Sequence, residues 1–171
     1  MQFDDNAPTA PDPKDAAQWD AVEEASELLH EERFKDALLV LRDVLKADGT
    51  NPYAFYFLGI ALYESGELEA ARDAYRACLK FAPKHLGARV ALTHVLRALG
   101  DFRASIQEGM IALTNAPGHA DVLYAIGMAH LARGDDSAAR RFLEAFLQAG
   151  PEFESSEEVK ELLGRLGGRP S

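Results

Sequence analysis

The side chains best suited to chemistry in this sequence are five histidines, one cysteine and several neighbouring glutamates. Imidazole, thiolate and carboxylate groups are the common metal ligands and general acid–base catalysts. A helix presents two ligands to one metal ion when they lie three or four residues apart. No two of the histidines have that spacing, and they are His30, His85, His94, His119 and His130. We therefore expect no metal site.

The other reactive groups have simple structural interpretations. Cys78, the only cysteine, lies among apolar residues at helical spacing, which is typical of a buried and unreactive thiol. Adjacent acids such as Glu23 and Glu24 are typical of a solvated helix face. The sequence contains no phosphate-binding loop, no HExxH zinc motif and no GxSxG nucleophile motif. These observations predict a protein that is not an enzyme and has no cofactor.

The elements that would position any functional residue follow a period of 34 residues. Glycine recurs at Gly66, Gly100 and Gly134, and proline recurs in the same period at 83, 117 and 151. Leucine recurs four times, at 45, 79, 113 and 147. A fixed period of this length is typical of a repeat protein. It divides the chain into repeats 18–51, 52–85, 86–119 and 120–153.

Each repeat is predicted to hold two helices, and the second repeat shows this most clearly. Pro52 suits the first turn of a helix, and apolar residues at helical spacing follow it as far as Leu62. Gly66 ends this helix, a second apolar stripe runs from Leu68 to Leu79, and Pro83 stops it. Another apolar stripe after the last repeat predicts one more helix over about 154–167.

The residues of the second repeat resemble the tetratricopeptide-repeat (TPR) signature. They place Leu-Gly at positions 7 and 8, glycine at 15, alanine at 20, tyrosine at 24 and proline at 32 of the repeat. The resemblance implies an all-α fold, a right-handed α-solenoid of four TPR helical hairpins plus a C-terminal capping helix. It makes 16–167 a single TPR domain, with a disordered N-terminal tail over 1–15 and a short tail over 168–171.

Family resemblance also implies where a ligand would bind. In TPR arrays the first helix of each repeat lines a concave groove, and the side chains at those positions here are mostly aromatic or apolar. Such residues anchor protein interfaces, so we expect a protein or peptide partner. The predicted groove residues are Trp19, Tyr53, Tyr56, Phe57, Ile60, Tyr63, His94, Arg97, Tyr124 and Met128. An alternative is that many of these side chains pack between neighbouring helices.

Charge narrows the range of partners. The formal net charge is −10, which disfavours nucleic acid and anionic membranes, and no apolar run is long enough to insert into a membrane. Residues 1–48 carry 13 acids and five bases, whereas residues 86–119 carry two acids and three bases. A partner with basic residues beside apolar anchors would suit this surface. A cytoplasmic location is expected, since the N-terminus has neither the basic nor the apolar region of a secretory signal.

Three interaction functions remain open at this point. The first is a general adaptor or scaffold that binds a peptide or helix in the groove. The second is a bacterial secretion-type chaperone that holds apolar segments of a client, although such chaperones usually have three repeats. The third is a self-assembling scaffold, a homo-oligomer in which the tail or a neighbouring subunit fills the groove. The carboxylate clamp by which some TPR proteins bind chaperone tails is absent, because Val22, Ser26 and Phe57 occupy its positions.

Overall fold

A computed structural model describes residues 12–168, and these form ten helices without any strand. The all-α fold expected from the sequence is therefore confirmed. The helices are α1 (Pro13–Asp20), α2 (Glu23–His30), α3 (Phe34–Ala47), α4 (Pro52–Glu64), α5 (Leu68–Phe81), α6 (Leu86–Ala98), α7 (Phe102–Asn115), α8 (Ala120–Arg133), α9 (Asp136–Gln148) and α10 (Phe153–Gly167).

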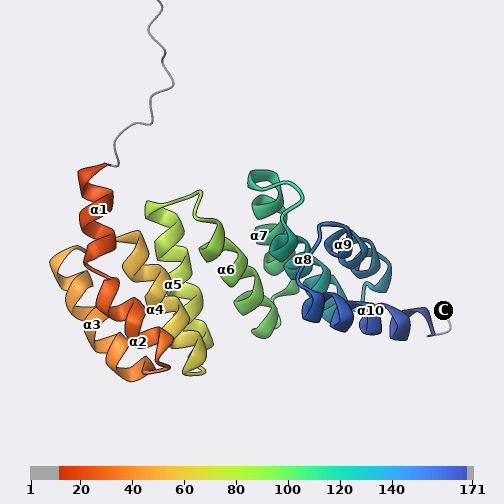
Figure 1. Ribbon diagram of the computed structural model, residues 1–171, viewed down its shortest axis with the longest axis horizontal. Helices are drawn as coiled ribbons and strands as arrows, with labels where there is room; N and C mark the ends of the chain where they lie inside the picture. Colours follow the sequence, from red (N-terminus) through yellow and green to blue (C-terminus); the bar gives the residue numbers. More distant parts are fainter. Residues whose placement is uncertain (1–11, 169–171) are drawn as a thin grey trace, which may run out of the picture.

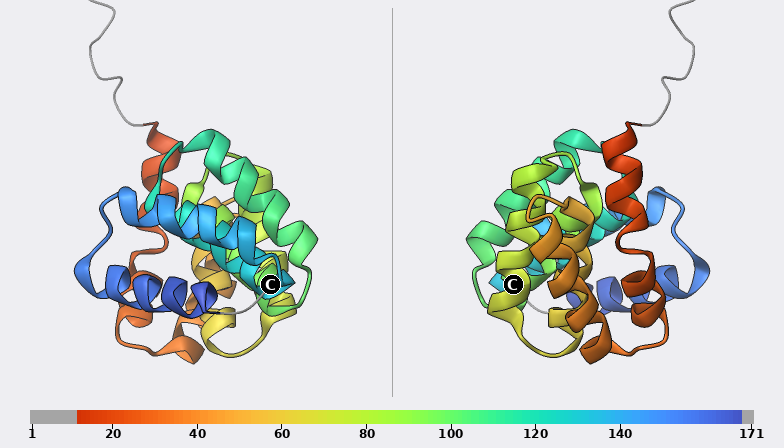
Figure 2. Two further views of the ribbon diagram at one scale, coloured as in Figure 1. Left: turned by 90° about the vertical axis from the view of Figure 1, so that its right-hand side faces the viewer. Right: turned by 90° about the vertical axis from the view of Figure 1, so that its left-hand side faces the viewer.

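The helices are arranged as a right-handed α-solenoid of successive hairpins. Helices α2 and α3, α4 and α5, α6 and α7, and α8 and α9 pack as pairs, and each pair packs on the next. The pairs follow one another along the long axis of the molecule, from α2 at one end to the capping helix α10 at the other (Figure 1). Seen along that axis, α10 and α7 lie on opposite sides of the solenoid (Figure 2).

The 34-residue period has a physical cause in the turn inside each hairpin. Gly66, Gly100 and Gly134 follow the first helix of their hairpins with φ angles of 79°, 81° and 85°. This left-handed conformation costs glycine little, because glycine has no Cβ to clash with the backbone. In the first hairpin the same position is Glu32, which adopts a φ of 57°. The periodic leucines help to join the hairpins: Leu79, for example, packs against a core cluster that includes Ala88 and Leu92 of the following helix.

The two helices of a hairpin approach closely where one of them has a small residue. A Cβ added to Gly59 of α4 would lie 2.6 Å from Cδ1 of Tyr75 in α5. A Cβ added to Gly127 of α8 would lie 2.8 Å from Cγ of Leu143 in α9. Position 8 of these repeats therefore has to be small so that the large residue at position 24 can pack against the backbone.

The N-terminal part of the described chain differs from what the sequence predicts. The predicted disordered tail 1–15 extends too far, because Pro13 already begins α1 and Asp12 caps it by accepting a hydrogen bond from the Lys14 amide. Residues 1–11 lie outside the described part of the chain. The first helix expected for repeat 18–51 is interrupted at residues 21–22, which separate α1 from α2.

Helix α1 is held against the α3–α4 connection by a buried polar network. Asn51, fully buried, donates from Nδ2 to the carbonyl oxygen of Gln18 at 2.8 Å. Its Oδ1 accepts from the Ala54 amide at 3.1 Å, so the same side chain also caps α4. Gln18 in turn donates to Asp48 Oδ2 at 2.7 Å. A short polar loop thereby fixes α1 beside α4.

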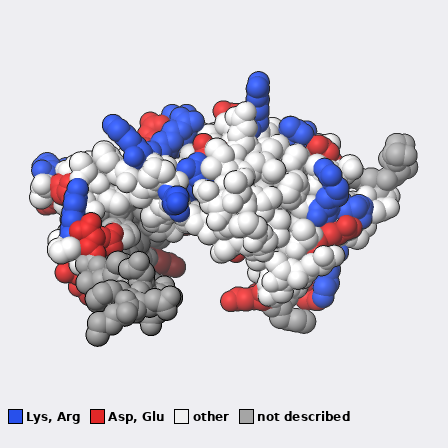
Figure 3. Space-filling model, turned by 90° about the horizontal axis from the view of Figure 1, so that it is seen from above, with Lys and Arg blue, Asp and Glu red and all other residues white. Residues whose placement is uncertain are grey.

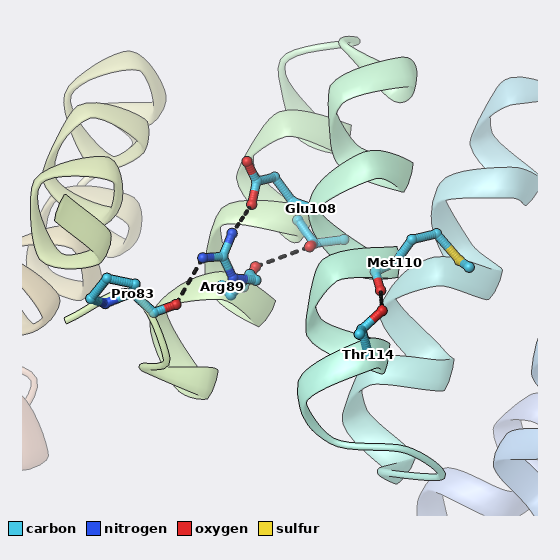
Figure 4. Close-up of polar contacts among 6 residues, drawn as sticks. Pro83, Arg89, Glu108, Met110 and Thr114 are labelled. Carbon is cyan, nitrogen blue, oxygen red and sulfur yellow. Dashed lines mark hydrogen bonds and ion pairs between the residues drawn. The ribbon is translucent and has the colours of Figure 1, made fainter.

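A polar link also joins the third hairpin to the connection before it. Arg89 of α6 pairs through Nη1 with Glu108 of α7, and its Nη2 donates to the carbonyl oxygen of Pro83 at 2.9 Å (Figure 4). The Arg89 side chain is only 12% exposed. Because a charge removed from water needs partners, this link holds α6, α7 and the α5–α6 connection in one arrangement. Further along α7, Thr114 donates to the carbonyl oxygen of Met110 at 3.0 Å.

Candidate interaction groove

Helix α1 and the first helices of the last three hairpins, α4, α6 and α8, supply the residues predicted to line a groove. None of the ten residues is fully buried in the core, and Trp19 and Tyr63 are 49% and 38% exposed. The space-filling view shows a hollow between the two ends of the solenoid, with acidic side chains on both sides of it (Figure 3). Lys and Arg side chains gather mainly along the opposite margin (Figure 3).

Four of the predicted residues form an aromatic cluster at the N-terminal end of the groove. The ring of Trp19 meets Tyr53 edge-on at a centroid distance of 5.2 Å and lies 6.1 Å from Phe57. Phe57 in turn lies 5.5 Å from Tyr56. The Tyr53 hydroxyl donates to Asp15 Oδ1 at 2.7 Å, and this hydrogen bond raises the pKa of Tyr53. Helix α1 therefore forms one wall of the groove and orients its rings.

The middle of the groove contains a cavity of about 380 Å³ between α4, α6 and α8. Val90, Ala91 and Gly87 form its apolar floor, and the rings of Tyr56, His94 and His119 surround it. Asp121, in the first turn of α8, adds a carboxylate at its edge. Burial lowers the pKa of His94, with a smaller effect in the same direction from Arg97, so the imidazole is neutral at pH 7.

The C-terminal end of the groove is built by α8 and the capping helix. His94 and Tyr124 have ring centroids 6.2 Å apart, and Tyr124 lies 5.5 Å from Phe146. Tyr124 and Met128 line a smaller cavity of about 280 Å³ together with residues of α10. The charged α10 residues at this cavity are Glu158, Glu161 and Arg165, and Arg165 pairs with Glu161 at 3.4 Å.

Three predicted residues do not join these ring clusters. Ile60 packs against the core cluster that includes Leu92 and Leu96, and so serves the hairpin interface as well as the groove. Tyr63 projects with 38% exposure and has no ring contact with another described residue. The Nε of Arg97 is buried and has no hydrogen-bond partner among the described residues. The structure thus groups seven of the ten residues and leaves these three apart.

His85 and Asp15 also contribute to the groove, although neither is among the ten predicted residues. His85 lies 4.6 Å from the ring of Tyr56, and its Nδ1 accepts from the Ala88 amide at 3.0 Å, which caps α6. Burial lowers the pKa of His85. The sequence does contain a signal for the capping role of His85: it directly precedes α6, and Asn51 occupies the same position before α4 one repeat earlier. Asp15 gave no signal, because it lies outside the repeats and inside the expected tail.

The potential metal ligands of the described residues are dispersed, and the single thiol is buried. No group of three His, Cys, Asp or Glu side chains in residues 12–168 is placed to hold a metal ion. Cys78 is fully buried, and burial raises the pKa of its thiol to about 12, so the thiolate needed for nucleophilic attack does not form at pH 7. Within the same residues, no helix is both long and apolar enough to cross a membrane.

Comparison with known proteins identifies the repeats and the fold. The sequence profile named tetratricopeptide repeat matches residues 22–85 and 90–152. MamA 41-end from Desulfovibrio magneticus RS-1 is 20% identical, with a TM-score of 0.76 over 92% of this chain and 85% of that one. YrrB, described as a TPR protein with an unusual peptide-binding site, is 20% identical, with a TM-score of 0.73 over 86% of this chain and 74% of that one.

A third similar structure is PilF of Pseudomonas aeruginosa, 17% identical, with a TM-score of 0.76 over 93% of this chain and 80% of that one. At these identities the similarity shows the fold alone. No curated protein sequence matches the chain.

Proposed function

The chain belongs to the tetratricopeptide repeat family, and from this premise we propose that it is a non-catalytic interaction module that binds a segment of a partner protein in its concave groove. Proteins of this family are in general interaction modules rather than enzymes. One observation carries the proposal: aromatic side chains from α1, α4 and α8, and His94 of α6, contact one another in ring clusters while remaining partly exposed.

The exposure of these rings favours a bound partner over a purely structural role. Trp19, Tyr56 and Tyr124 each contact other rings, yet none is fully buried by the described residues. Aromatic side chains combine a large apolar area with few rotamers, so they anchor interfaces at low entropic cost. A large apolar surface that remains in contact with water favours association with a partner.

The length of the groove favours an extended peptide or a single helix as the ligand. At one end of the groove is the aromatic cluster that contains Trp19 of α1, and at the other is the cavity lined by Met128 and α10. The cavity lined by Gly87 lies between them. A partner segment lying along the groove would contact all three. The description of YrrB as a peptide-binding TPR protein supports this mode of binding, although the resemblance to it is one of fold.

Two double variants test the groove as the binding surface. The first, Trp19→Ala/Tyr63→Ala, removes the two most exposed aromatic groove side chains, which are 49% and 38% exposed. The second, Met110→Ala/Ile111→Ala, removes apolar side chains of similar exposure, 43% and 44%, from α7 outside the groove. Both proteins must first show the wild-type helical circular dichroism and a comparable melting temperature.

Partners would then be captured from an extract of the native source on immobilised wild type and on both variants. We expect a partner that the wild type and the α7 variant retain and the groove variant loses, since each aromatic anchor contributes about 2 kcal/mol. Equal capture on all three proteins, or loss only on the α7 variant, would rule out the groove. If the retained partner is a second copy of this chain, the function is self-assembly.

A further inference from the structure

The cavity in the middle of the groove has walls of a particular chemistry. We propose that it is a specificity pocket for a lysine or arginine side chain of the bound segment, with Asp121 as the counter-ion and Tyr56 and His94 as the flanking rings. This inference rests on the proposed function, because the basic side chain would belong to the segment held in the groove.

The pocket combines the two features that recognise an organic cation. Aromatic faces attract ammonium and guanidinium groups through the negative potential above their rings. Tyr56 of α4 and His94 of α6 present rings to the cavity, and Asp121 of α8 adds a formal negative charge. An aliphatic side chain would pack on Val90 and Ala91 but would leave the Asp121 carboxylate without a counter-ion. A lysine or arginine side chain would contact the apolar residues through its stem and the carboxylate through its charged end.

Asp121 is available for an incoming cation. It is exposed, and no hydrogen bond or ion pair joins its carboxylate to any residue of the described chain. Its position in the first turn of α8 also lets it interact favourably with the helix dipole, but that role does not consume its hydrogen-bonding capacity. No lysine or arginine lines the cavity to neutralise it.

Other titratable groups around the pocket are compatible with a cation. His94 is neutral at pH 7 because its pKa is lowered, mainly by burial. His119 forms the edge of the cavity at the start of α8. The positive charge of Arg97, further along α6, acts on His94 but does not line the cavity.

The pocket has room for a long side chain because residue 87 is glycine. A Cβ built on Gly87 would lie 3.1 Å from the Tyr56 hydroxyl, so a larger side chain at this position would fill the space beside that ring. Gly87 is an exposed residue of α6, and the close contacts of an added Cβ would be with Tyr56 and His85 rather than with the buried core. Acidic side chains on both sides of the hollow would attract a basic segment toward it (Figure 3).

The test uses two pocket variants and two kinds of probe. Asp121→Asn removes the charge at constant size, and Gly87→Leu fills the cavity while leaving the charge. The first probe is a displayed library of random 12-residue peptides, selected on the wild-type protein. The second is the small molecule Nα-acetyl-arginine methylamide, compared with its norleucine and glutamate counterparts in amide-resolved NMR titrations of the intact chain.

We expect the selected peptides to share a lysine or arginine at a fixed distance from an apolar residue. Replacing that basic residue by norleucine should weaken binding to the wild type about tenfold, the effect of losing one hydrogen bond to a charged group. The same replacement should change binding to the Asp121→Asn variant less than twofold, and Gly87→Leu should weaken the unmodified peptide. The arginine probe alone should shift the amide signals of Gly87 and Ala91.

Each contrary result has a distinct meaning. Peptides that lose binding with Trp19→Ala/Tyr63→Ala but show no basic preference would overturn the pocket and leave the groove function standing. The pocket is also overturned if norleucine replacement costs as much with Asp121→Asn as with the wild type. Shifts from the arginine probe without any selected peptide would support the pocket and contradict peptide binding. Absence of both peptides and shifts would overturn both proposals.

Discussion

Gly109 of α7 lies opposite Thr93 of α6, so in this hairpin the glycine is on the second helix. In the hairpins before and after it, the glycine is on the first helix and the larger residue is on the second. A Cβ built on Gly109 would lie 3.5 Å from the Thr93 methyl carbon and 2.6 Å from Cγ1 of Ile126 in α8. In the second repeat the glycine is Gly59 on the first helix and the large residue is Tyr75 on the second. The third hairpin thus keeps its close packing by exchanging which helix contributes the small side chain.

This exchange predicts that Gly109→Ala destabilises the protein, although alanine is the better helix former. Alanine would gain about 1 kcal/mol in helix propensity at this position. Its Cβ would lie 2.6 Å from Cγ1 of Ile126, which is fully buried, so this side chain would have to shift within the core. Overpacking of this kind costs about 1–3 kcal/mol, so we expect a net loss of about 1 kcal/mol. Urea unfolding followed by circular dichroism would measure it.

Gly164 provides the matched control for that experiment. It also lies inside a helix, α10, but a Cβ built on it would meet nothing within 4 Å. Gly164→Ala should therefore raise the free energy of unfolding by up to about 1 kcal/mol through helix propensity alone. If both substitutions stabilise the protein, a side chain is tolerated at position 109. The inference that close packing requires a glycine there would then be wrong.

The hairpins could be predicted from the sequence, but the contacts between them could not. The 34-residue period placed the hairpins because a turn glycine or a helix-ending proline acts on the few residues beside it in the chain. Whether Gly109 was a weak point or a close contact could not be decided, because Ile126 belongs to the following repeat. The break between α1 and α2 also gave no sequence signal, since neither Ala21 nor Val22 disfavours a helix strongly.

The groove was predictable as a surface but not as a set of contacts. Repeat positions predicted residues such as Trp19 and Tyr124 for the groove, and in the structure each of them contacts another predicted ring. The pocket depends on Asp121, Gly87 and Tyr56 from three different hairpins, and no local pattern links them. Asp15 contributes from the part of α1 that precedes the first repeat.

A second prediction concerns Glu32, the only described non-glycine residue with a positive φ. It occupies the turn position that is glycine in the three other hairpins, and it is exposed. A left-handed conformation costs a residue with a Cβ about 1 kcal/mol or more. Glu32→Gly should therefore stabilise the protein by roughly 0.5–1 kcal/mol, after the greater flexibility of glycine in the unfolded chain is included.

The reciprocal change provides its control. Gly66→Ala introduces a Cβ at a φ of 79° where there is no steric obstacle within 4 Å, so only backbone strain is tested. It should destabilise the protein by about 1 kcal/mol. Thermal melts of both variants would show a rise for Glu32→Gly and a fall for Gly66→Ala. A fall for both would mean that the Glu32 side chain stabilises the first hairpin in another way.

A third prediction concerns Asn51, which serves two helices at once. Asn51→Ala removes the cap of α4. It also removes the hydrogen bond that the Asn51 side chain donates to the carbonyl oxygen of Gln18. Loss of a helix cap costs about 1 kcal/mol, and an unsatisfied buried polar group adds about 1–3 kcal/mol. We expect a total loss of about 2–3 kcal/mol in the free energy of unfolding.

The matched control is Asp101→Ala, since Asp101 caps α7 by the same type of bond but is exposed. Its loss should cost only about 1 kcal/mol. Because Asn51 also fixes α1, amide hydrogen exchange at residues 16–20 should accelerate in Asn51→Ala and stay unchanged in Asp101→Ala. Equal losses of stability in the two variants would contradict the dual role of Asn51.

The last prediction is a loss of stability below neutral pH that originates in three histidines. Burial lowers the pKa of His85, His94 and His130 from the ordinary value of 6.5, and for His94 a nearby arginine adds to the effect. In the unfolded chain these imidazoles take up protons near pH 6.5, whereas in the folded protein they do so only at lower pH. Because the unfolded state binds more protons, stability is full above about pH 6.5 and falls as the pH drops toward the folded values.

Each histidine can lower the free energy of unfolding by at most about 1.4 kcal/mol per pH unit in that range. Urea unfolding at pH 7.5, 6.5 and 5.5 would measure the slope, and His94→Gln should reduce it while leaving the stability at pH 7.5 little changed. Hydrogen bonds from Thr50 and Gln18 lower the pKa of the Asp48 carboxyl group to about 2. Protonation of Asp48 therefore changes the stability only between about pH 4 and 2, below the range of this measurement. A stability that is constant from pH 7.5 to 5.5 would show that the three imidazoles are not protected from protonation by the fold.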